Sequence, residues 1–229
     1  MARRVPPDRL AAVTDVAARV FIDRGYRQTR MADVAAELEL SSGSLYNYVE
    51  SKEALLHLVV EHGLGRRPPA LDLPVPTPTT GATLRLVEER LRREFVAPSL
   101  QDALTRERAD DIRAEVAAVL AERYDTVERT RDVLMLVERC APDIPGLGGL
   151  FFRRGRRGAT ADMVTYLSSR IDAGQLRPVP DVLHATRYVE EAIAWFAMHR
   201  YRDQDSAMLD DALSRQTAVE LGVNALVMP

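Results

Sequence analysis

The sequence is poor in several features that would point to particular classes of protein. Its 229 residues include a single cysteine, Cys140, which excludes an intramolecular disulfide and is typical of a reducing compartment. No apolar run approaches the roughly 18 residues that a membrane-spanning helix needs. Near the start, Arg3 and Arg4 are followed by prolines rather than by the apolar stretch of a signal peptide. We therefore expect a cytoplasmic protein with no membrane partner.

Charge of one sign is not in large excess either. Lysine and arginine total 31, and aspartate and glutamate total 34, so the net charge of −3 does not by itself favour nucleic acid as a partner. Residues 1–52 carry eight basic and seven acidic side chains, which is too small an asymmetry to decide anything. The only lysine is Lys52, and we attribute this preference for arginine to genomic base composition. With 46% hydrophobic and 28% charged residues, the composition is that of an ordinary globular protein.

The strict alternation that marks β-strands is also lacking, whereas helical spacing of apolar residues recurs throughout. It predicts a first helix over residues 8–24, which Gly25 ends. Five prolines between residues 65 and 80 exclude a regular helix there, and a glycine- and arginine-rich stretch, 146–158, interrupts the pattern again. Further helices are predicted over 31–38, from 41, from 52 to about 63, from 84 to about 95, and over 112–127, 130–140, 159–173, 181–201 and 206–226. The predicted fold class is all-α.

The segment from residue 25 to residue 56 is the most informative in the chain. Two short amphipathic helices there are separated only by Glu39 and Leu40, and the Ser41 side chain can accept a hydrogen bond from the N–H groups that open the second helix. A pair this short cannot bury its own apolar face, so we expect it to dock on the first helix, with Leu45 facing inward. The second helix of the pair then points outward, which is the arrangement that reads the DNA major groove in a helix-turn-helix domain.

This segment resembles the TetR family of transcriptional repressors. The residues that carry the resemblance are Gly25, Thr29, 33–35 (Asp-Val-Ala), 41–46 (Ser-Ser-Gly-Ser-Leu-Tyr) and 51–55 (Ser-Lys-Glu-Ala-Leu). The motifs occur in the family's order, and a weaker likeness to the C-terminal halves of some members continues at 174–177 and 195–200. The resemblance implies a regulator that binds double-stranded operator DNA as a homodimer.

Carried over residue by residue, the resemblance assigns DNA contacts to nine positions. Base contacts fall to Gly43, Tyr46 and Asn47. Phosphate contacts fall to Ser41, Ser42, Ser44, Tyr48 and Lys52. Thr29 supports these contacts from the helix before. For Tyr46 and Tyr48 the alternative is that the rings only pack against a short helix.

Three residues depart from the family's pattern. Glu39 stands where the turn often has glycine, and costs roughly 1 kcal/mol if its backbone is left-handed. Ser42 replaces a frequent lysine, which removes a cation from the interface. Arg30 replaces the usual serine or threonine after Thr29, so that a helix N-cap is lost and a phosphate ligand is offered instead.

Groupings that would carry catalysis or hold a metal are missing from the sequence. His57 and His62 lie five apart on one helix, so their side chains do not share a face. No glycine-rich phosphate loop, nucleophile elbow or pair of facing carboxylates occurs, so we expect no enzymatic activity, no metal and no cofactor. The densest basic cluster outside the first domain, Arg153 to Arg157, is interpreted as a solvated or ion-paired face, with an anionic ligand or a second DNA contact as alternatives.

Residues 1–52 are predicted to bind DNA, and residues 53–229 to bind a small molecule and to dimerise. The resemblance implies a ligand cavity among the middle helices, and its candidate lining residues are aromatic or methionine: Tyr124, Met135, Phe151, Phe152, Met163, Tyr166 and Trp195. Apolar faces on the last two helices predict a symmetric four-helix interface that includes Val182, Ala185, Val189, Phe196, Leu213 and Val223. Ordinary core packing is the alternative for both sets.

We therefore interpret the chain as a TetR-like transcriptional regulator, a repressor released from its operator by a small-molecule effector. The alternative is a helical ligand-binding or partner-binding protein whose DNA-binding head is not controlled by a ligand. A scaffold of that kind does not need the arrangement from Ser41 to Lys52, so this segment favours the first interpretation.

Overall fold

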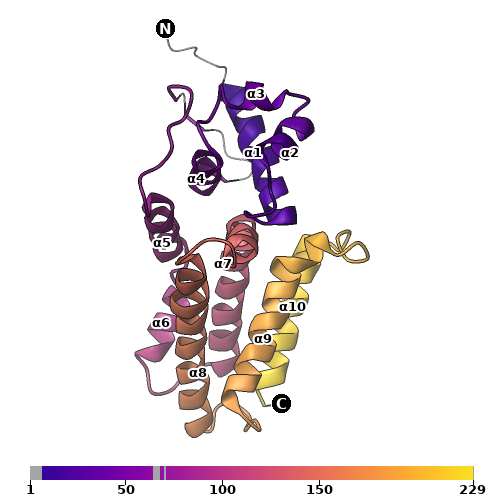
Figure 1. Cartoon of the computed structure of the whole chain (residues 1–229). Helices are drawn as coiled ribbons and strands as arrows, with labels where there is room; N and C mark the ends of the chain where they lie inside the picture. The colour runs from indigo at the N-terminus through magenta and orange to yellow at the C-terminus, as the bar shows by residue number, and fades with distance from the viewer. Residues whose placement is uncertain (1–6, 64–67, 70, 229) are drawn as a thin grey trace. The chain divides into compact units, whose positions relative to one another are not determined.

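The computed structural model describes residues 7–63, 68–69 and 71–228, and their regular structure is helical. Figure 1 shows the order of the elements. A π-helical segment, Gly149–Arg156, leads directly into α8, and a short 3₁₀ turn, His199–Arg202, follows α9. The helices are α1 (Pro7–Arg24), α2 (Met31–Glu37), α3 (Ser42–Leu45), α4 (Lys52–His62), α5 (Ala82–Glu94), α6 (Pro98–Leu104), α7 (Ile112–Cys140), α8 (Arg157–Asp172), α9 (Val182–Ala197) and α10 (Asp211–Leu226). The predicted all-α fold class is confirmed.

The chain divides into two compact units. Unit 1 comprises Met1–Arg92 and Asp132–Phe152, and unit 2 comprises Arg93–Arg131 and Arg153–Pro229. The long helix α7 belongs to unit 2 at its start and to unit 1 at its end. The predicted domain boundary after residue 52 stays a prediction.

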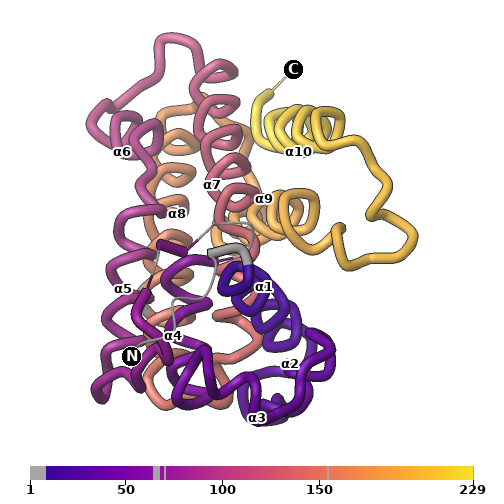
Figure 2. Tube along the Cα trace, turned by 90° about the horizontal axis from the view of Figure 1, so that it is seen from above, coloured from indigo at the N-terminus to yellow at the C-terminus, as the bar shows by residue number. Residues whose placement is uncertain are grey.

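The core of unit 1 forms between α1 and α4. The predicted apolar face of α1, which includes Val13, Ala17 and Phe21, is buried, as are Leu55 and Val59 of α4. These two helices pack against each other, and α2 and α3 pack together beside α1 (Figure 2). On each helix these apolar residues are spaced three or four apart, so they lie on one face of the helix and are buried together.

The turn between α2 and α3 contains a left-handed residue. Glu39 has φ of +54°, and among the described residues it is the one non-glycine position with positive φ. The next residue, Leu40, closes the turn by donating its N–H to the Ala35 carbonyl at 2.8 Å. A glutamate here costs about 1 kcal/mol relative to glycine because its Cβ crowds the backbone, so the condition stated in the sequence analysis is met.

Unit 2 is built around charged side chains that are buried and fully bonded. Arg170 of α8 has no exposed side-chain surface, and its guanidinium donates to Glu115 Oε1 at 2.8 Å. It also donates to the carbonyls of Ala103 at 2.7 Å and Arg106 at 2.9 Å, which lie at and just beyond the end of α6. One side chain therefore joins α6, α7 and α8.

The helices α9 and α10 pack against each other within unit 2. Gly222 allows α10 to approach α7 closely, because a Cβ at this position would lie 2.7 Å from Leu120 Cδ1. At the other end of α10, the Asp210 side chain accepts from the Leu213 N–H and begins the helix. The buried Arg200 donates to the Phe196 carbonyl and so caps the end of α9.

Several predicted boundaries were wrong. Residues 112–140 form one helix rather than two, because Glu128 and Arg129 are good helix formers and nothing there breaks the pattern. The stretch 146–158, predicted to interrupt the helices, is itself π-helical over Gly149–Arg156, and its last two residues belong to α8. The last helix begins at Asp211 rather than at residue 206, and α6 (Pro98–Leu104) was not predicted.

No helix in the described part of the chain is both long enough and apolar enough to cross a membrane.

Candidate nucleic-acid interface

The N-terminus of α3 is capped as the sequence predicts. Ser41 has an extended backbone, and its Oγ accepts a hydrogen bond from the Ser44 N–H at 3.1 Å. The two serine hydroxyls also bond each other at 2.8 Å. The hydrogen bonds between Ser41 and Ser44 stabilise the first turn of α3. They also hold these two predicted phosphate ligands side by side.

The three predicted base-contacting residues lie in α3 and directly after it, with Gly43 inside the helix and Tyr46 and Asn47 just beyond its last residue. Tyr46 is 48% exposed and Asn47 is also exposed, and neither side chain hydrogen-bonds to any residue that the structure describes. At Gly43 an added Cβ would come no nearer than 3.9 Å to Ser41 Oγ, so the fold does not require glycine there. Because Gly43 has no side chain, the backbone at this position can approach a partner closely. Ser42 is exposed beside it, and Leu45 faces inward with no exposed surface.

Thr29, predicted to support the interface, and Tyr48, predicted as a phosphate ligand, are both buried. The Thr29 side chain is 1% exposed, and its Oγ1 donates to the Gly25 carbonyl at 2.7 Å. Tyr48 is 7% exposed, which agrees with the packing alternative for this ring. Both side chains hold the domain together in the structure, and a direct contact of either with phosphate stays a prediction.

Lys52 lies inside a small network at the start of α4. Its Nζ donates to the carbonyls of Tyr26 and Thr29, both at 3.0 Å, and lies 4.4 Å from the centre of the Tyr26 ring. The Tyr26 hydroxyl in turn donates to Glu53 Oε1 at 2.9 Å, and burial raises the pKa of Tyr26. An ammonium has three donors, so one remains for a phosphate after the two carbonyls are bonded. Lys52 therefore ties the turn after α1 to α4 whether or not it also touches DNA.

Replacing Lys52 with methionine is expected to have two separable effects. The free energy of unfolding should fall by about 1.5–3 kcal/mol, because two hydrogen bonds to a charged group are lost while the apolar stem is kept. The salt dependence of binding to a non-specific duplex should become shallower by about one unit, as expected when one phosphate contact is removed. Denaturant titration measures the first effect, and fluorescence anisotropy at several salt concentrations measures the second.

Lys52→Arg is the matched control, because it keeps the charge and the donors. A Lys52→Met protein as stable as the wild type would contradict the tie between the turn and α4. An unchanged salt slope would contradict the phosphate contact and leave the tie in place.

The start of α2 adds exposed polar residues, of which the sequence analysis offered only Arg30 as a phosphate ligand. Arg27 and Gln28 precede Thr29, and Arg30 follows it at the N-cap of α2. Arginine has no acceptor, so Arg30 cannot cap with its side chain. Its backbone N–H instead bonds Asp33 Oδ2 at 2.8 Å, and this bond holds the pKa of Asp33 below its usual range. The run of polar residues around Thr29 was the signal available in the sequence.

The turn between α1 and α2 is tied to the end of α7 within unit 1. The Arg27 N–H donates to Asp143 Oδ2 at 2.8 Å, and the Arg139 guanidinium donates to the carbonyls of Asp23 and Arg24 at 3.3 Å. These bonds occupy carbonyls that the end of α1 would otherwise leave free. The polar side chains at the start of α2 are therefore presented from a turn that is fixed on its inner side.

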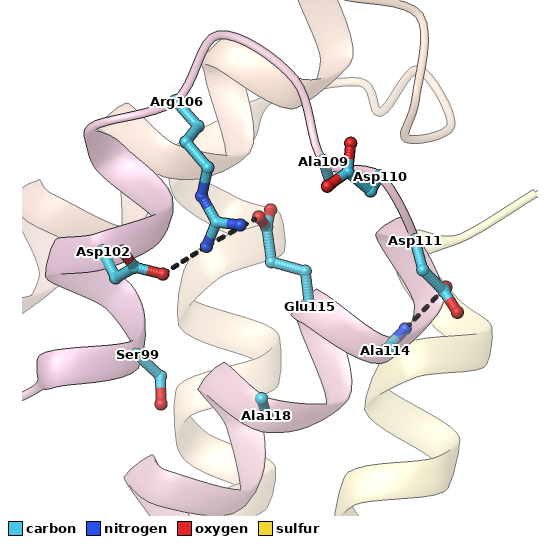
Figure 3. A pocket seen from close by; sticks show the side chains of 9 residues that line it. All are labelled: Ser99, Asp102, Arg106, Ala109, Asp110, Asp111, Ala114, Glu115 and Ala118. Carbon is cyan, nitrogen blue, oxygen red and sulfur yellow. Dashed lines mark hydrogen bonds and ion pairs between the residues drawn. The ribbon is translucent and has the colours of Figure 1, made fainter.

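A cavity of about 270 Å³ lies in unit 2 (Figure 3). Arg106 points between Asp102 and Glu115 and pairs with both, while Asp110 and Asp111 lie across the opening. Four of the nine lining residues are acidic and three are alanine, and none of the aromatic and methionine residues predicted for a ligand cavity is among them. It comprises Ser99, Asp102, Arg106, Ala109, Asp110, Asp111, Ala114, Glu115 and Ala118.

The predicted ligand-lining residues fall into both units. In unit 2, Tyr124, Met163 and Tyr166 are buried and Trp195 is half-buried. The Tyr166 hydroxyl donates to Glu115 Oε1 at 3.1 Å, and burial raises the pKa of Tyr124 to about 12. In unit 1, Phe151 is buried, and Phe152 and Met135 are half-buried. Their part in ligand binding stays a prediction.

The arginine-rich segment at the end of the π-helix carries ion pairs, as the first of its interpretations supposed. Arg156 pairs with Glu191 of α9, which also pairs with Arg187. Arg153 and Arg157 are exposed. Within the described residues no group of three histidine, cysteine, aspartate or glutamate side chains is arranged to hold a metal ion.

Residues 13–59 match the family model for bacterial regulatory proteins of the tetR family. The match spans α1, α2, α3 and most of α4, which is where the cap, the outward face of α3 and the Lys52 network lie. No curated protein matches the chain by sequence.

Solved structures share the fold over almost the whole chain. The ketosteroid transcriptional regulator KstR2 of Mycobacterium tuberculosis is 17% identical, with each chain covered to 100% and a TM-score of 0.59. AibR, solved in complex with isovaleryl coenzyme A and operator DNA, is 18% identical over 93% of this chain and 97% of its own, with a TM-score of 0.53. PfmR from Thermus thermophilus is 19% identical with the same coverage and a TM-score of 0.52. At these identities the likeness extends to the fold alone.

Proposed function

We propose that this chain, a member of the TetR family of DNA-binding transcriptional regulators, reads a specific operator by placing α3 in the major groove of double-stranded DNA. The observation that carries the proposal is the pairing of two exposed side chains, Tyr46 and Asn47, with a helix whose inner side is anchored by Leu45. Asparagine offers both a donor and an acceptor to base edges, and a tyrosine ring offers apolar contact and a hydroxyl. Exposed serines beside them suit phosphate oxygens.

The test is selection of duplexes from a random library by the wild-type protein. We expect enrichment of a short sequence, arranged as two half-sites if the protein acts as a dimer. Enrichment of no sequence after repeated rounds, with binding that depends on salt alone, would contradict the proposed function. The regulator is further proposed to repress transcription in the cytoplasm by occupying this operator.

The last two helices, α9 and α10, are the proposed dimer interface. The side chains proposed to form it differ in part from those that the sequence predicted. Val189 and Val223 are each 3% exposed, so their side chains offer almost no surface to a second copy. Val182, Ala185 and Phe196 are half-buried. Large apolar side chains are exposed on the same two helices: Leu183 and Tyr188 on α9, and Leu213 and Leu221 on α10. Exposed apolar residues on two adjacent helices suit a symmetric four-helix contact with a second copy.

Replacing Leu213 and Leu221 with glutamate should convert the dimer to a monomer. Four buried carboxylates in a symmetric apolar interface are strongly unfavourable, because each loses its hydration. Light scattering at micromolar concentration measures the change, and affinity for the selected duplex should fall because one head loses the second half-site.

Val96→Glu is the control, since Val96 is similarly exposed but lies between α5 and α6. It should leave the dimer intact. A wild-type monomer at these concentrations, or a Leu213→Glu/Leu221→Glu dimer, would contradict the proposed interface.

We further propose that a mostly apolar small molecule releases the regulator from its operator. This proposal is supported by the many aromatic and methionine side chains of the C-terminal region and by the fold shared with AibR, which was solved with a coenzyme A thioester and operator DNA. An effector shifts the equilibrium only if it prefers the form that does not bind DNA. Anisotropy of the selected duplex, run against hydrophobic, cationic and acidic compounds with Trp195 emission as a second readout, tests this step. A compound that changes Trp195 emission without lowering operator affinity would show binding without release.

A further inference from the structure

The long connection between α4 and α5 contains a segment in which every second residue is proline. Residues 74–78 read Pro-Val-Pro-Thr-Pro, and we call them the proline strap. Because proline has no backbone N–H, this segment has only two backbone donors, those of Val75 and Thr77. In an extended chain, residues two apart direct their N–H groups to the same edge. The strap can therefore pair along one edge and leaves no donor on the other.

Both donors are bonded to the turn that joins α3 to α4. The Val75 N–H donates to the Tyr48 carbonyl at 2.8 Å, and the Val75 carbonyl accepts from the Glu50 N–H at 3.0 Å. The Thr77 N–H donates to Glu50 Oε2 at 2.8 Å, and its Oγ1 donates to Ser51 Oγ at 2.8 Å. In Figure 1, residues 71–81 of this connection pass beside α4 and lead into α5.

The bonded turn determines where the base-reading side chains stand. Tyr46 and Asn47 come directly before Tyr48, and the backbone from α3 onward is a continuous series of turns, with the Val49 N–H bonded to Leu45. On the inner side the turn is anchored by Tyr48 and Val49, which are buried. On the outer side it is bonded by the strap. At the far end, Ser51 caps α4 by accepting from the Ala54 N–H at 3.1 Å, and the strap supports this same hydroxyl.

We propose that the proline strap is a positioning element for DNA recognition: it fixes residues 48–51 and so sets the placement of Tyr46 and Asn47 in the groove. The proposal rests on the proposed function, since it concerns the same face of α3. Prolines suit this role because they hold the segment extended before it pairs, so less conformational freedom is lost on docking. The strap itself carries no positive charge, so it acts through the turn rather than by attracting phosphate.

The test compares Val75→Pro/Thr77→Pro with Val75→Ala/Thr77→Ser. The first variant removes both N–H donors and keeps an extended segment, and the second keeps both donors and the hydroxyl. The probes are a fluorescein-labelled duplex that the wild type selected from a random library and a shuffled duplex of equal composition. We expect the proline variant to bind the selected duplex about tenfold more weakly, from the loss of two hydrogen bonds. Binding to the shuffled duplex should stay within about twofold, as should both affinities of the control.

Equal binding of the selected duplex by the two variants would overturn the proposal. So would an equal loss on both duplexes, since that is the result of a general structural defect. Should the proline variant not fold, Thr77→Val carries the test, with an expected loss of about threefold on the selected duplex alone; no loss would overturn the proposal. In the wild type, the Glu50, Val75 and Thr77 amides should exchange slowly with solvent, and fast exchange of all three would also overturn it. Because every arm uses a duplex that the wild type has already selected, failure here leaves the proposed function standing.

Discussion

Replacing both Tyr46 and Asn47 with alanine should abolish most of the protein's preference for its selected duplex. Each base-reading contact contributes about 1–3 kcal/mol, so the double variant should lose between about 30-fold and 10⁴-fold in affinity for that duplex. Affinity for a shuffled duplex should change little, because contacts with phosphate supply that binding. Anisotropy titrations of the two duplexes under one salt condition measure both quantities.

Both side chains are exposed and make no hydrogen bond within the described residues, so their removal should leave the free energy of unfolding nearly unchanged. Tyr46→Phe separates the ring from the hydroxyl. Gln101→Ala, at an exposed position of α6 in unit 2, serves as the control for surface substitution in general. A double variant that still prefers the selected duplex as strongly as the wild type would remove α3 from the recognition surface.

Replacing Arg170 with alanine should destabilise the protein by about 3–5 kcal/mol, because it removes the buried guanidinium that donates to the Glu115 carboxylate and to two carbonyls. The Tyr166 hydroxyl still donates to Glu115 but does not replace the lost positive charge. Few single substitutions outside the apolar core have effects of this size. The expected change is a lower denaturant midpoint with an unchanged slope, measured by circular dichroism.

Arg106 is a matched control for Arg170. Its side chain also lies near Glu115, at 3.8 Å, but it is 45% exposed and pairs with Asp102 at the surface. Solvent screens such a pair, so Arg106→Ala should cost less than about 1 kcal/mol. Similar losses for the two variants would mean that burial of Arg170 is not what makes its bonds strong.

The parts of the fold that were predictable are those where local chemistry decides. Ser41 caps α3 and Leu45 faces inward, and each follows from one residue and its neighbours. The left-handed backbone of Glu39 was raised only as a condition, from the glycine that the family often has there. The predicted break between residues 127 and 130 was wrong, because α7 is continuous there. The apolar spacing lapses at Glu128 and Arg129, but both residues favour a helix. The π-helical segment contains Gly149 and Gly155, which argue against a helix locally, so local propensity could not predict it.

The candidate interface was predictable in outline and not in the roles of single residues. Tyr46 and Asn47 are exposed, as the motif implied, but motif position could not reveal that Thr29 is buried or that Lys52 is bonded to two carbonyls. Those roles depend on what the turn after α1 brings nearby. The proline strap shows the same limit, because its alternation was visible in the sequence while its partner, the turn after α3, lies more than twenty residues away.

The central claim is that this regulator distinguishes one DNA sequence from others. The ratio of its affinities for the selected duplex and for a shuffled duplex tests this claim most directly. The measurement is an anisotropy titration of the wild-type protein with the selected duplex and with a shuffled duplex of equal length and composition, at one physiological salt concentration. The account predicts that the selected duplex binds at least about 10³-fold more tightly. Equal affinity for the two duplexes would contradict it.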